Sequence, residues 1–183
     1  MDATPEDKRS FVDFLVQQGF YYQVEQELQD STQSSQRSSL LYQALQNCCS
    51  QHLRASTSLD INARNLYTIL HHHIHADIAY GYLKKTGEQR TDYEEQLAIS
   101  KERVRRAGQA LVEQVMKHVR RRYDQGHLWA AFEGSHAAQN IAFETGAQLC
   151  DEDKNWAMRL AHEALDAGKY NLENARKEPG MLY

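Results

Sequence analysis

The placement of proline constrains the fold of this chain more than any other feature of its sequence. Only two prolines occur among 183 residues, and both lie near the ends, at Pro5 and Pro179. Proline breaks helices because it lacks an amide hydrogen and clashes with the preceding turn. Apolar residues recur at helical spacing, and no segment shows the period-two alternation that is typical of a strand. We therefore predict an all-α fold.

Local signals place the helices along the chain. Thr4-Pro5-Glu6-Asp7 is a helix start, and Thr91-Asp92-Tyr93-Glu94 fits a capping box. Nothing after Thr91 breaks the helical pattern until Gly126, so the helix that begins there is long. We expect a single-domain bundle over residues 1–183, with about six helices, one of them long and central. We expect the first helix to start at Pro5 and to have a weak point at Gly19. The other five helices span about 39–54, 60–85, 91–123, 127–149 and 151–177. The remaining segments are a polar loop at 30–39 and a C-terminal tail at 178–183.

The long helix carries an apolar stripe along its length, and such a stripe has to be buried. It includes Tyr93, Leu97, Val104, Leu111, Val115 and Val119. Either the rest of the chain or a second copy can cover it, and we expect a homodimer. In the helix at about 60–85, we expect Leu70, Ile74 and Ile78 on the core side.

The sequence predicts a cytoplasmic protein that does not enter a membrane. No segment approaches the roughly 20 apolar residues needed to cross a bilayer. The first residues are acidic and polar, unlike a secretory signal. Three cysteines, Cys48, Cys49 and Cys150, form an awkward set for disulfides and fit reduced thiols.

Charge is distributed unevenly along the chain. Residues 101–123 carry eight cationic and two acidic side chains, a balance of +6 in a chain whose net charge is −4. A basic helix of this kind favours binding to an acidic partner surface. Because the whole molecule is acidic, an acidic protein fits at least as well as RNA. Our first hypothesis is a non-enzymatic adaptor that needs no cofactor and binds through this helix and its exit turn. The residues that we expect to contact the partner are Lys101, Arg105, Arg106, Lys117, Arg120 and Arg121.

A second hypothesis comes from the end of the same helix. Four residues separate Arg122 from His127 across a predicted helix–helix turn. This spacing resembles the Arg-x(4–6)-His motif of the all-α HEPN ribonuclease domains. The resemblance implies that His127 acts as acid or base on a ribose 2′-hydroxyl while Arg122 steadies the phosphate, without a metal.

A third hypothesis is a metal-binding helical bundle. The run His71-His72-His73-Ile74-His75 lies inside a predicted helix, where His71 and His75 form an i, i+4 pair. Two imidazoles at that spacing can bind zinc or another first-row ion. Further ligands could come from Glu133 and His136, spaced Glu-x-x-His on the helix at about 127–149. We also expect His73 to pair with Asp77 one turn later.

Overall fold

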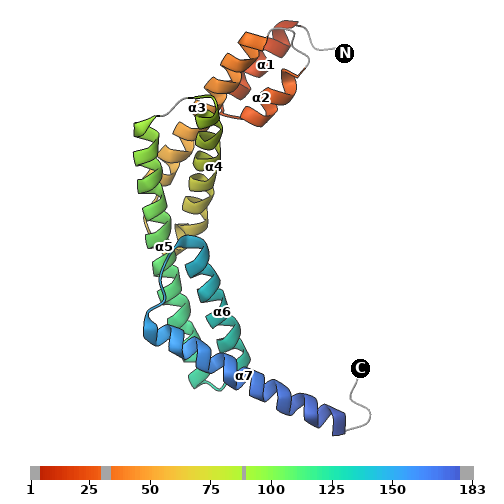
Figure 1. Cartoon of the computed structure of the whole chain (residues 1–183), viewed down its shortest axis with the longest axis vertical. Coiled ribbons are helices and arrows are strands. Elements are labelled where there is room, and N and C mark those ends of the chain that lie inside the picture. Colours follow the sequence, from red (N-terminus) through yellow and green to blue (C-terminus); the bar gives the residue numbers. More distant parts are fainter. Residues whose placement is uncertain (1–4, 30–33, 88–89, 178–183) are drawn as a thin grey trace. The chain divides into compact units, whose positions relative to one another are not determined.

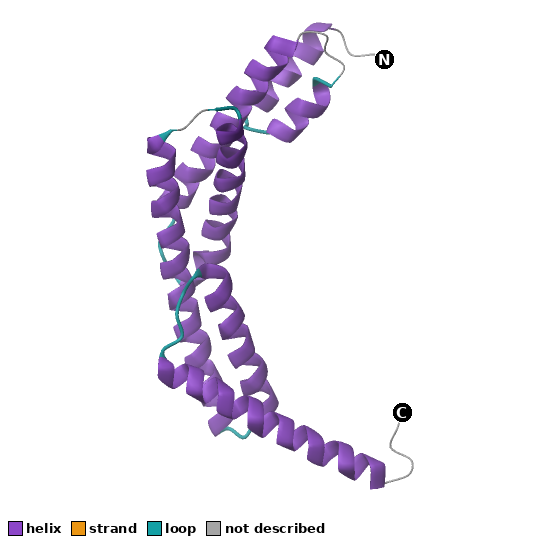
Figure 2. Cartoon of the chain, viewed as in Figure 1, coloured by secondary structure: helices purple, strands orange, loops and turns teal. Residues whose placement is uncertain are grey.

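The computed structural model describes residues 5–29, 34–87 and 90–177. Within these ranges the chain is helical and contains no strand (Figure 2). The described residues form seven α-helices, labelled in Figure 1, and also a short 3-10 helix, η1. Their bounds are α1 Pro5–Gln17, α2 Tyr21–Glu27, α3 Ser34–Ser58, η1 Ala63–Asn65, α4 Leu66–Lys85, α5 Thr91–Asp124, α6 Leu128–Thr145 and α7 Asp151–Lys177. The all-α prediction is therefore confirmed for the described residues.

The number of helices differs from the expected six because Gly19 divides the first one. Gly19 has a positive φ of 72°, a conformation that glycine adopts without strain. A Cβ at this position would lie 2.6 Å from the backbone nitrogen of Cys48, so the turn also packs directly on α3. What the sequence suggested as a weak point is thus a tight turn between α1 and α2.

The helix that follows begins earlier than expected. α3 starts at Ser34, so residues 34–39 of the stretch expected to be a loop are helical. Residues 30–33 of that stretch, and the tail at 178–183, lie outside the described residues. The helix expected at about 60–85 also starts later, because α4 begins at Leu66 after the short helix η1. Asn62 caps η1: its carboxamide oxygen accepts hydrogen bonds from the amides of Arg64 and Asn65, each at 3.0 Å.

The described chain forms two compact units. The first consists of Met1–Ile61 and Tyr67–Val104, and the second of Asn62–Leu66 and Arg105–Tyr183. Helix α5 contributes residues to both. The prediction of a single domain over residues 1–183 is not tested by this division and stays a prediction.

In the first unit, α1 and α2 pack on each other and on α3. A larger core joins α3, α4 and the first turns of α5, with Cys49, Leu53, Ala76 and Leu83 almost completely buried. One polar contact is buried with it: the hydroxyls of Ser56 on α3 and Ser100 on α5 lie 2.7 Å apart, and both residues are fully buried. Arg103 donates hydrogen bonds to the carbonyls of Ser56 and Leu59, at the end of α3.

In the second unit, α5, α6 and α7 enclose a core that includes Val112, Met116 and Leu160. Small residues on α6 allow close packing: Ala131, Ser135, Ala138 and Ala142 are buried. The closest approach involves Gly108 on α5, where a Cβ would lie 2.2 Å from the hydroxyl oxygen of Thr145 on α6.

The stripe on α5 is largely covered within the chain. Tyr93, Leu97, Val104 and Val119 are buried, whereas Leu111 and Val115 are only partly covered. The need to bury this stripe therefore gives no reason to expect a homodimer. None of the described helices is both long enough and apolar enough to cross a membrane.

Candidate functional site

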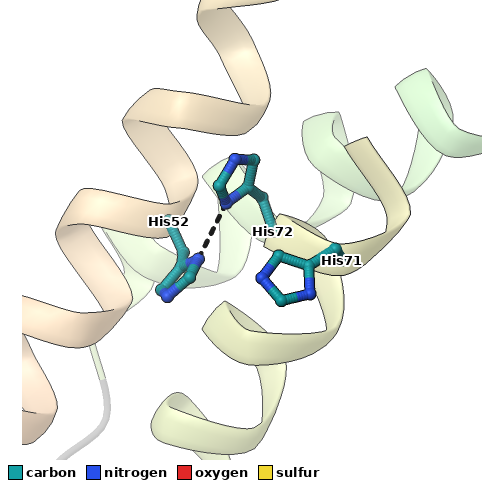
Figure 3. Close-up of side chains that lie close together, drawn as sticks. All are labelled: His52, His71 and His72. Carbon is teal, nitrogen blue, oxygen red and sulfur yellow. Dashed lines mark hydrogen bonds between the residues drawn. The ribbon is translucent and has the colours of Figure 1, made fainter. Parts of the chain in front are cut away.

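Histidines from two helices of the first unit converge at one place. His52 comes from α3, and His71 and His72 come from α4. The Nδ1 atoms of His52 and His72 are 2.9 Å apart. One ring nitrogen from each of the three residues can be chosen so that all lie within 4.8 Å of one another. Figure 3 shows the three rings turned toward the space between the two helices.

A fourth histidine packs against this group. The ring of His75 stacks on that of His52, with centroids 4.9 Å apart and an interplanar angle of 15°. Its centroid lies 4.4 Å from that of His71. We call His52, His71, His72 and His75 the histidine cluster.

A cavity of about 380 Å³ opens beside the histidine cluster. His52, His71 and His75 form part of its wall, together with Cys48 on α3. The rest of the wall consists of residues 18–23, which form the turn between α1 and α2 and the start of α2. The contact of Gly19 with Cys48 holds this turn against α3, so the tight turn also shapes the cavity.

The environment of His52, His72 and His75 favours neutral imidazoles. Burial, followed by the proximity of His75, His72 and His71, lowers the pKa of His52 to about 4. Burial and neighbouring histidines also lower the pKa values of His72 and His75. The nearby Cys48 thiol stays protonated at neutral pH, because burial raises its pKa to about 11.

His73 points elsewhere and does not belong to this cluster. Its Nδ1 atom is buried and has no hydrogen-bond partner among the described residues. His73 does not form a hydrogen bond with Asp77, the partner expected for it. Burial lowers the pKa of His73, and the nearby charge of Asp77 partly opposes this effect.

The core side of α4 differs from our expectation. Ile74 and Ile78 are exposed, and the buried positions are Leu66, Ile69, Ala76, Ala79, Tyr80 and Leu83. Apolar residues occur all around this helix, so their spacing does not select one face. The rotation of the helix places His72 toward His52 on α3.

The structure therefore brings together two of the four residues expected as metal ligands, His71 and His75, and adds His52 and His72. The other two, Glu133 and His136, lie on α6 in the second unit. His136 is exposed, and its Nδ1 lies 3.4 Å from the Asn140 carboxamide nitrogen. One signal for His52 was available in the sequence: it lies four residues after Cys48, on the apolar face of its helix.

One cationic residue of α5 is held by ion pairs within its unit, whereas several others are exposed. Arg120 is held within the second unit, because its guanidinium donates to Glu152 at 3.1 Å and to Asp153 at 2.8 Å, both on α7. Lys117 and Arg121 are exposed, and neither forms an ion pair with another described residue. Of the remaining candidates, Arg105 and Arg106 are exposed residues of the second unit and Lys101 is an exposed residue of the first.

Lys117 and Arg121 flank a hollow in the second unit. Its volume is about 390 Å³, and its apolar lining includes Leu111, Val115 and Val119. Gly134 on α6 also lines it, and a Cβ there would lie 2.7 Å from a methyl carbon of Val119. We call this hollow the α5 groove: an apolar floor bordered by cationic side chains.

A second hollow lies at the exit turn of α5. Arg122, His118 and His127 line a cavity of about 660 Å³ together with Trp129. Arg122 Nε donates a hydrogen bond to His118 Nε2 at 3.2 Å, which orients the guanidinium along its own helix. The imidazole of His127 makes no capping hydrogen bond with α6, so it is not used in starting that helix. The two residues of the Arg-x4-His pair therefore share one cavity.

No family model matches the chain, and neither a curated protein nor a solved structure is significantly similar to it.

Proposed function

We propose that this protein is a non-enzymatic adaptor that binds an acidic, amphipathic segment of a partner protein in the α5 groove. The observation that carries the proposal is the combination of an apolar floor and two cationic side chains, Lys117 and Arg121, without an ion-pair partner among the described residues. An amphipathic peptide can place an apolar side chain on the floor and its carboxylates beside the cations.

The charge pattern supports a protein partner over RNA. The chain as a whole has a net charge of −4, whereas nucleic-acid domains are usually basic. Arg120, which forms ion pairs with Glu152 and Asp153 on α7, does not line the groove. The proposal also assigns the protein to the cytoplasm. It includes a homodimer as one oligomeric state in which the groove is presented to the partner.

A peptide-display selection against the full chain tests this function directly. We expect the enriched peptides to carry Asp or Glu around one or two large apolar residues. Their affinity should fall at least about tenfold in the double variant Lys117→Glu/Arg121→Glu, because two attractions become repulsions. The matched control is Arg54→Glu/Arg64→Glu, which makes the same change of charge outside α5 and should bind normally. Equal loss in both variants would show that only net charge matters.

A single-stranded RNA oligonucleotide should be measured in parallel with the peptides. If RNA binds more tightly than any selected peptide, and the Lys117→Glu/Arg121→Glu variant loses that binding, the partner is a nucleic acid and the adaptor proposal fails. Salt dependence adds a second readout, because RNA affinity falls steeply as counterions are released.

A ribonuclease that uses Arg122 and His127 is the second candidate function, favoured by the shared cavity of these two residues. In this proposal Trp129 supplies an aromatic wall on which a base can stack. His127→Ala should then abolish RNA cleavage and leave the circular dichroism spectrum unchanged, while His162→Ala should cleave at the normal rate. Cleavage that survives the loss of His127 removes this candidate.

A further inference from the structure

We propose that His52, His71 and His72 bind one first-row divalent metal ion, Zn²⁺ or a close equivalent, between α3 and α4. This site belongs to the first unit and uses none of the residues of the α5 groove. It is therefore an additional binding activity, independent of the proposed adaptor function.

The distances between the ring nitrogens suit a shared ion. Zinc binds histidine at about 2.0–2.1 Å, so two nitrogens on one tetrahedral ion lie about 3.3 Å apart. The observed 2.9 Å between His52 Nδ1 and His72 Nδ1 is close to this value, and the three residues fit within 4.8 Å. Binding one ion requires the widest of these separations to shorten by up to about 1.5 Å.

The contact between His52 and His72 also constrains which ring nitrogens carry a hydrogen. Two nitrogens 2.9 Å apart are stable only if one carries a hydrogen and the other a lone pair. A metal ion removes this requirement, because both nitrogens can then donate lone pairs while each ring carries its hydrogen on Nε2. Neutral imidazoles need only change tautomer, so no net proton has to leave.

The type of donor atom determines which class of metal ion suits this site. The described donors are the imidazole nitrogens of His52, His71 and His72. The nearby Cys48 thiol is held protonated and does not compete as a thiolate. Imidazole suits zinc, copper and nickel, whereas magnesium and calcium prefer oxygen.

The cavity beside the cluster supplies access. His52 and His71 form part of its wall, so an ion can enter from solvent and water can complete its coordination. His75 stacks on His52 and packs near His71, which restricts both rings. We assign His75 a positioning role rather than a place among the three principal ligands.

Calorimetric titration of the full chain with ZnCl₂, after removal of any affinity tag and of bound metal, tests the proposal. We expect about one zinc per chain and no heat from MgCl₂. His52→Gln and His72→Ala should each weaken zinc binding at least about 100-fold, more than the loss typical of residues that only support ligands. His75→Ala should weaken it less than either. Circular dichroism confirms that each variant is folded, and Gln at position 52 preserves much of the packed volume.

His136→Ala is the matched control, because it removes an exposed histidine from the second unit. It should bind zinc normally if the site is the one proposed here. Zinc binding that persists in folded His52→Gln and His72→Ala variants would overturn the proposal. Loss of binding in His136→Ala would also overturn it, in favour of a site that uses α6. Neither result bears on peptide binding in the α5 groove, so the two proposals are tested separately.

Discussion

Replacing Gly108 by alanine should destabilise the second unit, although alanine is the better helix former. Gly108 lies in the interior of α5, where the change from glycine to alanine normally stabilises a helix by about 1 kcal/mol. The added Cβ would, however, lie 2.2 Å from the hydroxyl oxygen and 2.5 Å from the Cβ of Thr145. Contacts this short require one of the two helices to move.

The magnitude follows from what Thr145 already does. Its hydroxyl donates to the Ile141 carbonyl at 2.6 Å and accepts from the Ala147 amide at 3.3 Å, and the residue is buried. Overpacking of a core costs about 1–3 kcal/mol, and a lost hydrogen bond adds about 1 kcal/mol. After the gain in helix propensity, Gly108→Ala should lower the free energy of unfolding by about 1–3 kcal/mol.

Gly168→Ala is the control within the same unit. Gly168 lies in α7, where a Cβ would meet the Trp129 ring at an ordinary 3.7 Å. This variant should be more stable than the parent by about 0.5–1 kcal/mol. Urea unfolding followed by tryptophan fluorescence measures both, because Trp129 and Trp156, the only tryptophans in the chain, lie in this unit. If both variants shift the transition in the same direction by similar amounts, the close packing of α5 on α6 is refuted.

Three further predictions can be tested with the full chain and single-residue variants of it. At pH 7.5, N-ethylmaleimide should modify Cys150 alone in the native protein, because burial raises the pKa of Cys48 to about 11 and that of Cys49 to about 12; more than one adduct by mass spectrometry contradicts this. The metal-free protein should lose stability as the pH falls from 6.5 toward 4. In that range the unfolded chain binds a proton at position 52, whereas burial and the neighbouring His75, His72 and His71 keep the pKa of folded His52 near 4. His52→Gln should reduce the loss between pH 7 and 5 in urea titrations with EDTA, and an undiminished loss argues against this origin. Arg120→Ala should destabilise the protein by about 0.5–1 kcal/mol, since two partly exposed ion pairs with α7 are lost, and Arg121→Ala by less; equal effects would show that the ion pairs contribute nothing.

The helix bounds that the sequence predicted best are those with a local chemical signal. Thr91 and Asp151 begin α5 and α7 where expected, since polar N-terminal residues and the following carboxylates act within one turn. Gly19 was noticed as a weak point, but nothing local distinguishes a flexible point within one helix from a turn between two. The contact of Gly19 with Cys48, which decides between them, is tertiary.

The candidate sites were predicted less completely for the same reason. The spacing of His71 and His75 on one helix was visible in the sequence, whereas the approach of His52 depends on how α3 packs against α4. The rotation of α4 was also hidden, because apolar residues such as Ile74 and Ile78 occupy its exposed side. On α5, the positions of all the cations were visible in the sequence, but that Glu152 and Asp153 hold Arg120 and not Arg121 was not.

The buried hydroxyl pair of Ser56 and Ser100 has a consequence for how α3 and α5 find their alignment. In the observed register each hydroxyl satisfies the other, and the net gain is only about 0.5–1.5 kcal/mol. If the helices slipped by one turn, bringing Ser56 opposite Val104, the Ser56 hydroxyl would lose this partner and face an apolar side chain. An unsatisfied buried hydroxyl costs about 1–3 kcal/mol, a substantial part of the 5–15 kcal/mol that typically separates folded from unfolded chains. Apolar side chains alone tolerate such a slip, so the two serines act mainly by excluding competing alignments of the same helices.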